Sequence, residues 1–434
     1  MPSSLADRAT PAHLGLAERV RLRAATLAGD AAALGSRLAG RGSGASIRGQ
    51  ILTRLAPDAF GLLLKGRRVL SVSGTNGKTT TTHLLAAAIR AGLGPDAARL
   101  VTNADGANLH YGIASALSQQ RDADIAVLET DERVVSDMID KGRPEILVLL
   151  NFSRDQLDRH HEIKSLGRAW RQALEKAGPA GPVIVANADD PLVTWAAGTA
   201  ARVIWVDTAT RWSADAALCP ACGTVLGRLE PVGGSPGSWD CPGCDLTEPR
   251  ADYAVVGDAI LLPDGRRVEP RLNVPGSFNV ANAACALAAA AEFGVELDTA
   301  LAGMRQVTAP AGRFASATFG TTTARLLLAK NPAGWAEALP LAASDPLILA
   351  IDSVAADGKD VSWLWDVEYE QLAGRRVIAT GPRAQDLAVR LSYAGVDHSV
   401  IPDLSAALAG HPEPVDVIAT YTPFQRLLKM GGLR

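Results

Sequence analysis

The stretch VLSVSGTNGKTTTTH, from Val69 to His83, joins a strand, a glycine loop and a helix. Val69–Ser73 is rich in β-branched and aliphatic residues, whereas Leu84–Ala91, directly after the stretch, has the alanine and leucine content of a helix. Glycines let a loop turn tightly and bring backbone N–H groups onto phosphate oxygens at a helix N-terminus. The stretch therefore predicts a phosphate-binding site in an α/β fold.

The residue types in this loop point to ATP with magnesium. The Lys78 ammonium would contact the terminal phosphates, and the Thr79 hydroxyl is a natural Mg²⁺ ligand. A standard P-loop has a further glycine five residues before Gly77, where this chain has Val72. An ordinary strand-to-helix turn would not need Gly-Lys-Thr-Thr at this junction. The predicted ATP-binding residues of the loop are Gly74, Thr75, Asn76, Gly77, Lys78, Thr79 and Thr80.

Short apolar runs alternate with helical segments along the rest of the chain, which is typical of βαβ units and a mainly parallel sheet. A first group of runs precedes a Gly-, Pro- and Cys-rich region at 208–253, and a second group follows Arg313. We therefore expect a central α/β domain with an insertion, and a smaller Rossmann-like α/β domain after it. The predicted strands are Val69–Ser73, Ile125–Glu129, Glu145–Leu150, Val183–Ala186 and Val203–Val206, then Leu326–Ala329, Leu347–Ile351, Arg376–Ala379 and Val415–Ala419.

The charge balance differs between the start of the chain and the whole. The 434 residues carry a net charge of -3, which argues against a general nucleic-acid binder. Residues 1–68, however, hold eleven Lys/Arg against four Asp/Glu. This excess fits either a solvated arginine-rich helical face or apposition to an anionic membrane surface or substrate. Because no apolar h-region and no uncharged membrane span is present, we expect a cytoplasmic protein, with membrane proximity at the inner face as the open alternative.

Four of the five cysteines are paired as Cys219-Pro-Ala-Cys222 and Cys241-Pro-Gly-Cys244, with eighteen residues between the pairs. Thiolates at this spacing can close a tetrahedral Cys₄ site around structural Zn²⁺, which leaves no open position for catalysis. Disulfides are the alternative, and a cytosolic location disfavours them. The fifth cysteine, Cys285, lies in an alanine-rich helix and is expected to be a small buried hydrophobe.

Several motifs together resemble the Mur ligase family. Its ATP loop is GxxGKT without the extra glycine, so Val72 is no objection. Glu129 in VLETDE matches the glutamate that binds Mg²⁺ in the family, and the segment from Asn151 to His160 resembles its Asn-x-x-x-Asp-His-Leu-Asp-Arg motif. Further matches are Pro275–Asn282 (PGSFNVAN) to the adenine motif, Ala311-Gly-Arg313 to the hinge arginine, and Lys330-Asn-Pro332 to an Asn-Pro motif.

This resemblance implies a reaction and roles for the matched residues. Mur ligases use ATP to convert a carboxylate into an acyl-phosphate that an amine then attacks. Lys78 and Glu129 would act in catalysis, with Glu129 and Thr79 on Mg²⁺, Asn279 on the adenine and Arg313 on the phosphates. Asn279 and Asn282 are three residues apart on a helix, so both amides can face one site.

The chain also departs from the ordinary members of the family. The glycine loop begins too early for the N-terminal domain that binds a UDP-linked substrate. Gln156 replaces a Mg²⁺-binding histidine, and Arg171 lies where many members have a carbamylated lysine. The four-cysteine insertion is foreign to them as well.

The loop from Asp352 to Asp366, DSVAADGKDVSWLWD, is dense in carboxylates and tryptophan and follows a predicted strand. On its own it could be a solvated turn over packed tryptophans. Within the family it resembles the DGxDxSWxWD signature of a small branch that amidates the D-glutamate α-carboxyl of lipid II. That branch takes ammonia from a GatD-like glutamine amidotransferase subunit. The resemblance suggests that Asp360, or failing it Asp357, completes the catalytic triad of that partner.

The resulting expectation is an ATP-dependent carbon–nitrogen ligase subunit of peptidoglycan biosynthesis, with ATP, Mg²⁺ and structural Zn²⁺ as cofactors. Two alternatives remain open: a ligase that adds an amino acid, as in folylpolyglutamate synthesis, and a nucleotide-dependent assembly protein. The expected domains are a basic helical segment at 1–45, the ATP-binding domain at 46–315 with the zinc ribbon at about 212–252, and the ligase domain at 316–434.

Overall fold

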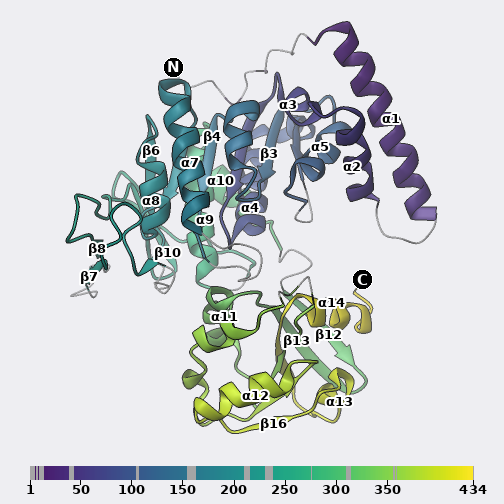
Figure 1. The fold of residues 1–434 in the computed structure, drawn as a ribbon, viewed down its shortest axis with the longest axis vertical. Coiled ribbons are helices and arrows are strands. Elements are labelled where there is room, and N and C mark those ends of the chain that lie inside the picture. Colours follow the sequence, from purple (N-terminus) through teal and green to yellow (C-terminus); the bar gives the residue numbers. More distant parts are fainter. Residues whose placement is uncertain are drawn as a thin grey trace.

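Two sheets organise the chain in the computed structural model, which is shown in Figure 1. The larger sheet belongs to the part of the chain before residue 269, and the smaller one begins at Phe314. The structure describes residues 5, 8, 14–38, 44–103, 107–153, 163–209, 216–229, 238–274, 276–308, 314–354, 357 and 359–433.

The larger sheet has nine strands in the order β11-β10-β9-β6-β5-β4-β1-β3-β2. It is parallel from β2 to β9, and β10 and β11 extend it as antiparallel strands. The strands are β1 (Arg68–Ser73), β2 (Leu100–Thr102), β3 (Ile125–Glu129), β4 (Ile146–Leu149), β5 (Val183–Asn187), β6 (Val203–Asp207), β9 (Tyr253–Val256), β10 (Ala259–Leu261) and β11 (Arg267–Val268).

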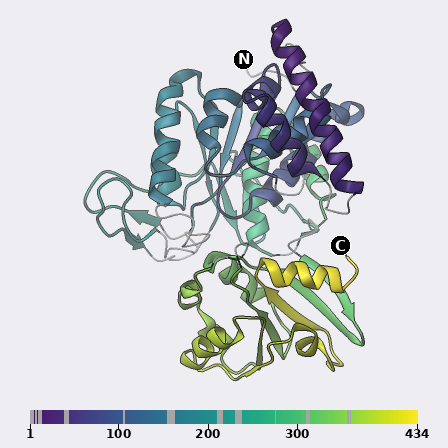
Figure 2. The same cartoon turned by 45° about the vertical axis from the view of Figure 1, so that its right-hand side comes forward.

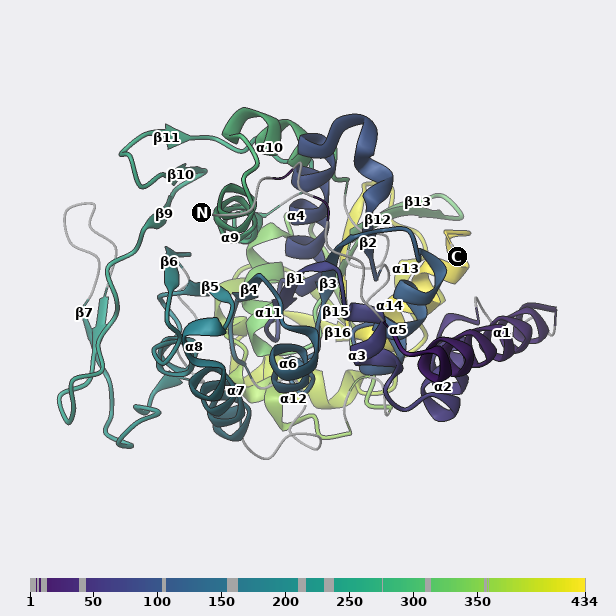
Figure 3. The same ribbon diagram turned by 90° about the horizontal axis from the view of Figure 1, so that it is seen from above.

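Helices cover both faces of this sheet, because side chains alternate across each parallel strand and both faces are apolar. Leu70 and Val72 of β1 pack under α4 (Lys78–Leu93), α9 (Phe278–Glu292) and α10 (Leu297–Met304). Val69 faces the opposite side, where α5 (His110–Gln119) lies. On that side α7 (Ile163–Ala177) and α8 (Pro191–Ala197) cover β4 and β5, as Figure 3 shows from above.

The smaller sheet has six strands in the order β12-β13-β17-β14-β15-β16, and only β12 is antiparallel to its neighbour. One face packs against α11 and α12, and the other against α13 and α14. The elements are β12 (Phe314–Phe319), β13 (Thr322–Leu328), α11 (Pro332–Ala338), β14 (Leu347–Ala350), β15 (Val377–Thr380), α12 (Ala384–Tyr393), β16 (His398–Val400), α13 (Leu404–Leu408), β17 (Val415–Ala419) and α14 (Tyr421–Met430).

The remaining elements lie at the start of the chain, in the cysteine region and in the connections of both units. The chain begins with α1 (Leu16–Leu38), α2 (Ala45–Leu55) and α3 (Ala59–Leu64), and the cysteine region contains the two-stranded sheet of β7 (Gly227–Leu229) and β8 (Ser238–Asp240). Short helical segments are α6 (Val135–Asp137), Gly94–Arg99, Met138–Gly142, Gly178–Ala180, Leu339–Leu341, Ser362–Asp366 and Tyr369–Leu372. Across the described ranges, every helix is too short or too polar to cross a bilayer.

The predicted α/β class is confirmed, with a parallel sheet in each part and every predicted strand present within one to four residues at either end. The predictions missed β2, β16, the antiparallel β12, the β9–β11 extension and the small β7–β8 sheet of the cysteine region. The domain limits at 45, 315 and 434 stay predictions.

Candidate active site and metal centre

The glycine loop has the geometry that a phosphate site needs. Gly74 and Gly77 adopt positive φ angles of 142° and 83°, and α4 begins at Lys78. A Cβ on Gly74 would lie 2.8 Å from Leu150 Cβ, and one on Gly77 would lie 2.4 Å from Asn282 Oδ1. Only glycine fits these two positions, and they turn the chain from β1 into the N-terminus of α4, the end of a helix at which anions bind.

Lys78 is held at the mouth of the loop by the protein itself. Its Nζ donates to the Gly74 carbonyl and lies 3.2 Å from the Thr75 carbonyl and 3.1 Å from Glu132 Oε2. The side chain is 10% exposed and Glu132 14% exposed, so this ion pair is largely buried. Glu132 was not predicted as a site residue. It follows β3 by three residues, and nothing near it in the sequence indicates that it pairs with Lys78. Thr79 is half-buried and Thr80 buried in the first turn of α4.

The segment after β4 braces the loop from one side. The Asn76 N–H donates to Asn151 Oδ1 at 2.8 Å, and Asn76 Nδ2 donates to Ser153 Oγ at 3.0 Å. The Ser153 N–H donates in turn to Thr75 Oγ1 at 3.0 Å. Asn151 therefore has a place in the site, and its role is to fix the loop through backbone and side-chain contacts.

Glu129 has a free acceptor where the resemblance implies a magnesium ligand. It ends β3 directly beside Val72 of β1, and its Oε1 accepts a 3.0 Å hydrogen bond from Asn108 Nδ2. Its Oε2 is buried and has no hydrogen-bond partner among the residues that the structure describes. A buried carboxylate oxygen without a partner is costly unless a ligand completes it. The Asn103 side chain holds the backbone of Glu129. Its Oδ1 accepts from the Glu129 N–H at 2.8 Å, and its Nδ2 donates to the Glu129 carbonyl at 2.7 Å.

The two asparagines of the adenine motif lie together, as their spacing predicted. Asn282 Nδ2 donates to Asn279 Oδ1 at 2.9 Å, and Thr81 Oγ1 donates to Asn282 Oδ1 at 3.2 Å. Both amides are buried on α9 and join this helix to the glycine loop. A role of Asn279 in holding adenine stays a prediction.

The smaller unit reaches the glycine loop through the Asn-Pro motif. Asn331 caps α11 by accepting from the Gly334 N–H at 2.9 Å, and its Nδ2 donates to Asn76 Oδ1 at 3.3 Å. This bond spans 255 residues of sequence and places α11 beside the loop.

The aspartates of the C-terminal loop have different environments. Asp360 is exposed and accepts from the Ser362 N–H at 2.8 Å, a bond that lowers the pKa of its carboxyl. Asp357, which the sequence offers as the second candidate for the partner's triad, does not project outward. It is 4% exposed, its Oδ1 accepts from the Thr422 N–H at the start of α14, and its Oδ2 has no partner among the described residues. Asp352, after β14, is also buried, and its N–H donates to Thr420 Oγ1.

Some predicted residues lie outside the described part of the chain. These are Arg313 with the rest of the hinge motif, Pro275 of the adenine motif, and Gln156, Asp158 and His160 after Asn151.

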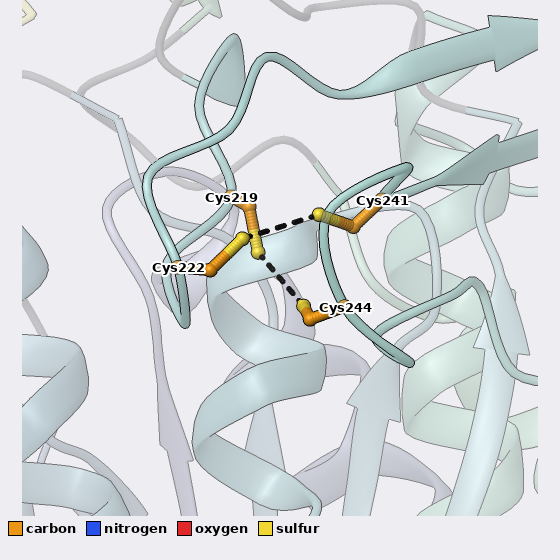
Figure 4. Close-up of side chains that lie close together, drawn as sticks. All are labelled: Cys219, Cys222, Cys241 and Cys244. Carbon is orange, nitrogen blue, oxygen red and sulfur yellow. Dashed lines mark hydrogen bonds between the residues drawn. The ribbon is translucent and has the colours of Figure 1, made fainter.

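The four cysteines of the insertion converge, as Figure 4 shows, from two loops. All four Sγ atoms lie within 4.8 Å of one another, with Cys219 and Cys244 at 3.6 Å and Cys222 and Cys241 at 3.4 Å. A tetrahedral zinc with Zn–S bonds of about 2.3 Å would separate its sulfurs by roughly 3.8 Å, so the cluster fits that ion. All are free thiols, and disulfides are therefore not the arrangement here.

Hydrogen bonding in this cluster favours the thiolate, the form that binds metal, at one of the four cysteines. Hydrogen bonding with Thr224, first through its side chain and then through its backbone, lowers the pKa of Cys222 to about 6. Burial raises the pKa of Cys241. Cys285 is fully buried in α9, and burial raises its pKa to about 12, which confirms it as an inert core residue.

The cysteine region is attached to the carboxyl edge of the larger sheet. Trp239 of β8 is 2% exposed, and its Nε1 donates to the Ala188 carbonyl, just after β5, at 3.0 Å. Two residues later Asp190 caps α8 and accepts from the Phe152 N–H at 2.7 Å. Phe152 lies between the two residues that brace the glycine loop, so a short series of contacts joins the cysteine region to that loop.

Two family models match the chain, one over each sheet. The Mur ligase middle domain matches residues 72–217, and the MurT ligase C-terminal domain matches residues 328–424. Both models describe domains of Mur ligases, so the chain is similar to this family of ligases in both of its units.

Within this family, the chain is similar to the MurT subunits. The chain is 28% identical over 387 residues to the lipid II isoglutaminyl synthase (glutamine-hydrolyzing) subunit MurT of Streptococcus pneumoniae, which covers 84% of this chain and 85% of that protein. The subunit of the same name from Staphylococcus aureus strain N315 is 28% identical over 378 residues, which cover 82% of this chain and 85% of that protein. The resemblance indicated by the aspartate-rich loop is thus confirmed.

Solved structures support the fold. A pseudomurein peptide ligase type C from Methanothermus fervidus superposes with a TM-score of 0.64 at 17% identity, covering 85% of this chain and 80% of that one. MurF from Acinetobacter baumannii superposes with a TM-score of 0.60 at 16% identity, covering 87% of this chain and 79% of that one.

Proposed function

We propose that this chain activates the α-carboxyl of D-glutamate in the stem peptide of lipid II, so that ammonia converts it to D-isoglutamine. A carboxylate oxygen would attack the γ-phosphorus of ATP and release ADP. Ammonia would then attack the acyl carbon, with loss of phosphate and a proton. The substrate is inferred from the MurT relatives, which carry it in their name.

The observation that carries the activation step is the pairing of the glycine loop with Glu129. Lys78 at the start of α4 would neutralise charge on the transferring phosphoryl group, and the partnerless Glu129 Oε2 with Thr79 would hold Mg²⁺. When bound, Mg²⁺ would supply charge neutralisation between the phosphates. Asn279 would position the adenine, and Arg313 would contact the phosphates.

Ammonia is proposed to come from a GatD-like glutamine amidotransferase subunit. A glutaminase needs an activated nucleophile, and the cysteines of this chain offer none. Four lie within one cluster and Cys285 is buried with a raised pKa. The word subunit in the relatives' name supports the division of labour. We place this reaction in the cytoplasm, with the cysteine cluster binding structural Zn²⁺.

Reconstitution tests the proposal. The chain is combined with its partner glutaminase, lipid II, MgATP and glutamine, and the product is analysed by mass spectrometry. Exchange of a hydroxyl for an amine makes the product slightly lighter, whereas addition of an amino acid makes it heavier by a residue. Lys78→Ala should reduce turnover by about 10²- to 10³-fold, while the exposed Lys65→Ala should not change it. A heavier product, or a product formed without ATP, would refute the amidation.

A further inference from the structure

Helix α1 exposes five of its six large apolar side chains along its whole length, and the sixth, Leu22, packs partly against the core. A helix of a self-contained protein normally turns such residues toward the core. Here they lie outward, three or four positions apart when the exposed Ala24 and Ala31 are included, which forms a continuous stripe. We call it the outer stripe; its large members are Leu16 (73% exposed), Val20 (59%), Leu27 (68%), Leu34 (55%) and Leu38 (82%).

The opposite face of α1 is made mostly of small residues, with Leu22 beside them, and determines this orientation. Ala25, Gly29 and Ala33 are buried against α2. A Cβ on Gly29 would lie 2.9 Å from the Arg48 carbonyl, so the two helices touch at their backbones. If α1 were rotated to bury the outer-stripe leucines, these side chains would have to fit between the two backbones. The close contact leaves no room for them.

Ion pairs hold the helix in the same orientation. Arg48 Nε lies 2.7 Å from Asp30 Oδ1, and Arg21 Nη2 lies 2.7 Å from Asp58 Oδ2. Figures 1, 2 and 3 all place α1 at the outer margin of the molecule, beside α2 and away from the smaller sheet.

Positive charge borders the outer stripe. Arg19, Arg23 and Arg37 each follow a stripe residue by three positions, so all three lie along the same side of it. All are exposed, and none forms an ion pair within the described part of the chain. The acidic Asp30 on this side is already paired with Arg48.

We propose that α1 is a membrane-surface helix that lies on an anionic lipid bilayer, with the outer stripe in the acyl boundary and the arginines on the headgroups. An amphipathic helix of 23 residues, about 35 Å long, with leucines bordered by arginines has the chemistry that such a surface binds. The inference deepens the proposed function, since a lipid-linked substrate is reached at a membrane.

Charge disfavours a second copy of the same helix as the occupant. Two α1 helices paired through their outer stripes would place arginines of like charge along the seam, without acidic partners to offset them. An anionic bilayer offers both the apolar volume and the negative charge that this face lacks.

Vesicle flotation tests the inference with the full-length protein. We expect binding to vesicles containing phosphatidylglycerol and little binding to pure phosphatidylcholine. Since each arginine near such a surface contributes about a fivefold gain in partitioning, Arg19→Gln, Arg23→Gln and Arg37→Gln combined should weaken binding by roughly a hundredfold. Leu27→Glu with Leu34→Glu should abolish it. The matched control is Val389→Glu, an exposed apolar residue on α12, which should bind as the unaltered protein does.

Two further readouts separate this inference from its rivals. All variants should keep the circular dichroism spectrum and, with the partner, the rate on a lipid-free muropeptide, while α1 variants lose rate only on vesicle-embedded lipid II. If neither substrate reacts, the proposed function fails while flotation still decides the role of α1. Absence of flotation, equal binding to neutral vesicles, or a dimer that Leu27→Glu dissociates would overturn the membrane assignment.

Discussion

Gly77 is where the glycine loop comes closest to α9, and this contact makes a sharp prediction. In Gly77→Ala an alanine would have to adopt the left-handed backbone conformation of Gly77, and its Cβ would clash with Asn282 Oδ1. We expect a loss of at least about 1 kcal/mol in unfolding free energy, together with weaker ATP binding, measured by denaturant unfolding and calorimetric titration.

The control for this substitution is Gly35→Ala, whose Cβ meets nothing within 4 Å in the last turn of α1. It should stabilise the protein by about 0.5–1 kcal/mol. Unchanged stability and ATP affinity in Gly77→Ala would contradict the packing of Asn282 over the loop.

Asp360 and Asp357 are expected to separate in their effects. Asp360 is exposed and kept ionised by its lowered pKa, so it can orient an imidazole of a partner. Asp360→Asn should abolish glutamine-dependent amidation, and added ammonia should restore it. Asp357→Asn should instead lower stability, because its carboxylate binds the N-terminus of α14.

Glutamine hydrolysis, ammonia-driven amidation and thermal unfolding of the reconstituted pair distinguish these roles. Asp122→Asn, a change at another exposed aspartate, is the control. If ammonia fails to rescue Asp360→Asn, this aspartate acts in the ligase site, and if nothing changes, it only caps the turn before Ser362.

At this scale the sequence revealed the residues that belong to motifs and not those that support them. The glycine loop, Glu129 and the asparagines of α9 have spacings that local geometry explains. Glu132 and Asn108 do not, because each meets its partner only through the packing of β3 against β1 and of the segment before α5. The burial of Asp357 was also beyond reach, since it depends on the path of α14.

The folding of the cysteine region should depend on a bound metal, and this region should also influence ATP binding at the glycine loop. We expect about one zinc per chain by metal analysis, lost in Cys222→Ser and kept in Cys285→Ala. Chelation should lower the thermal midpoint, because metal binding supplies folding free energy to such a ribbon. A metal-free protein with an unchanged melting profile after chelation would defeat this assignment.

The contact from Trp239 to Ala188 predicts the second effect. Trp239→Phe keeps most of the ring and removes the Nε1–H, which leaves the Ala188 carbonyl with only the longer hydrogen bond from Thr194 Oγ1 at 3.3 Å. The lost bond should cost about 1 kcal/mol. Since Asp190 joins this loop to Phe152, we expect the KM for ATP to rise several-fold while zinc stays bound. Trp195→Phe, on α8, is the control; equal KM values in both variants would disprove the link.

Element types were predictable where periodicity was strong. The buried parallel strands read as apolar runs and the helices between them as alanine- and leucine-rich segments. The short edge strands β2 and β16 could not be read, because three residues carry too little pattern. The outward orientation of the leucines on α1 was equally hidden, since helical spacing shows a stripe without showing which face is buried.

For the whole molecule, the account rests on two units meeting at the glycine loop. The bond from Asn331 to Asn76 places the MurT-type domain beside the phosphate site, so substrate activation and the partner's ammonia would converge there. The family was predictable from the motifs of both units together. How the units face each other was not, because one side-chain contact across 255 residues leaves no trace in local sequence.

The transfer of oxygen from substrate to phosphate tests the central claim, carboxylate activation by ATP, most directly. Lipid II labelled with ¹⁸O in the D-glutamate α-carboxyl is converted by the reconstituted pair, and the released phosphate is analysed by mass spectrometry. The account predicts one ¹⁸O atom in inorganic phosphate for each amide formed, and none with Lys78→Ala. Amide formed with unlabelled phosphate, or with the label in AMP, would contradict it.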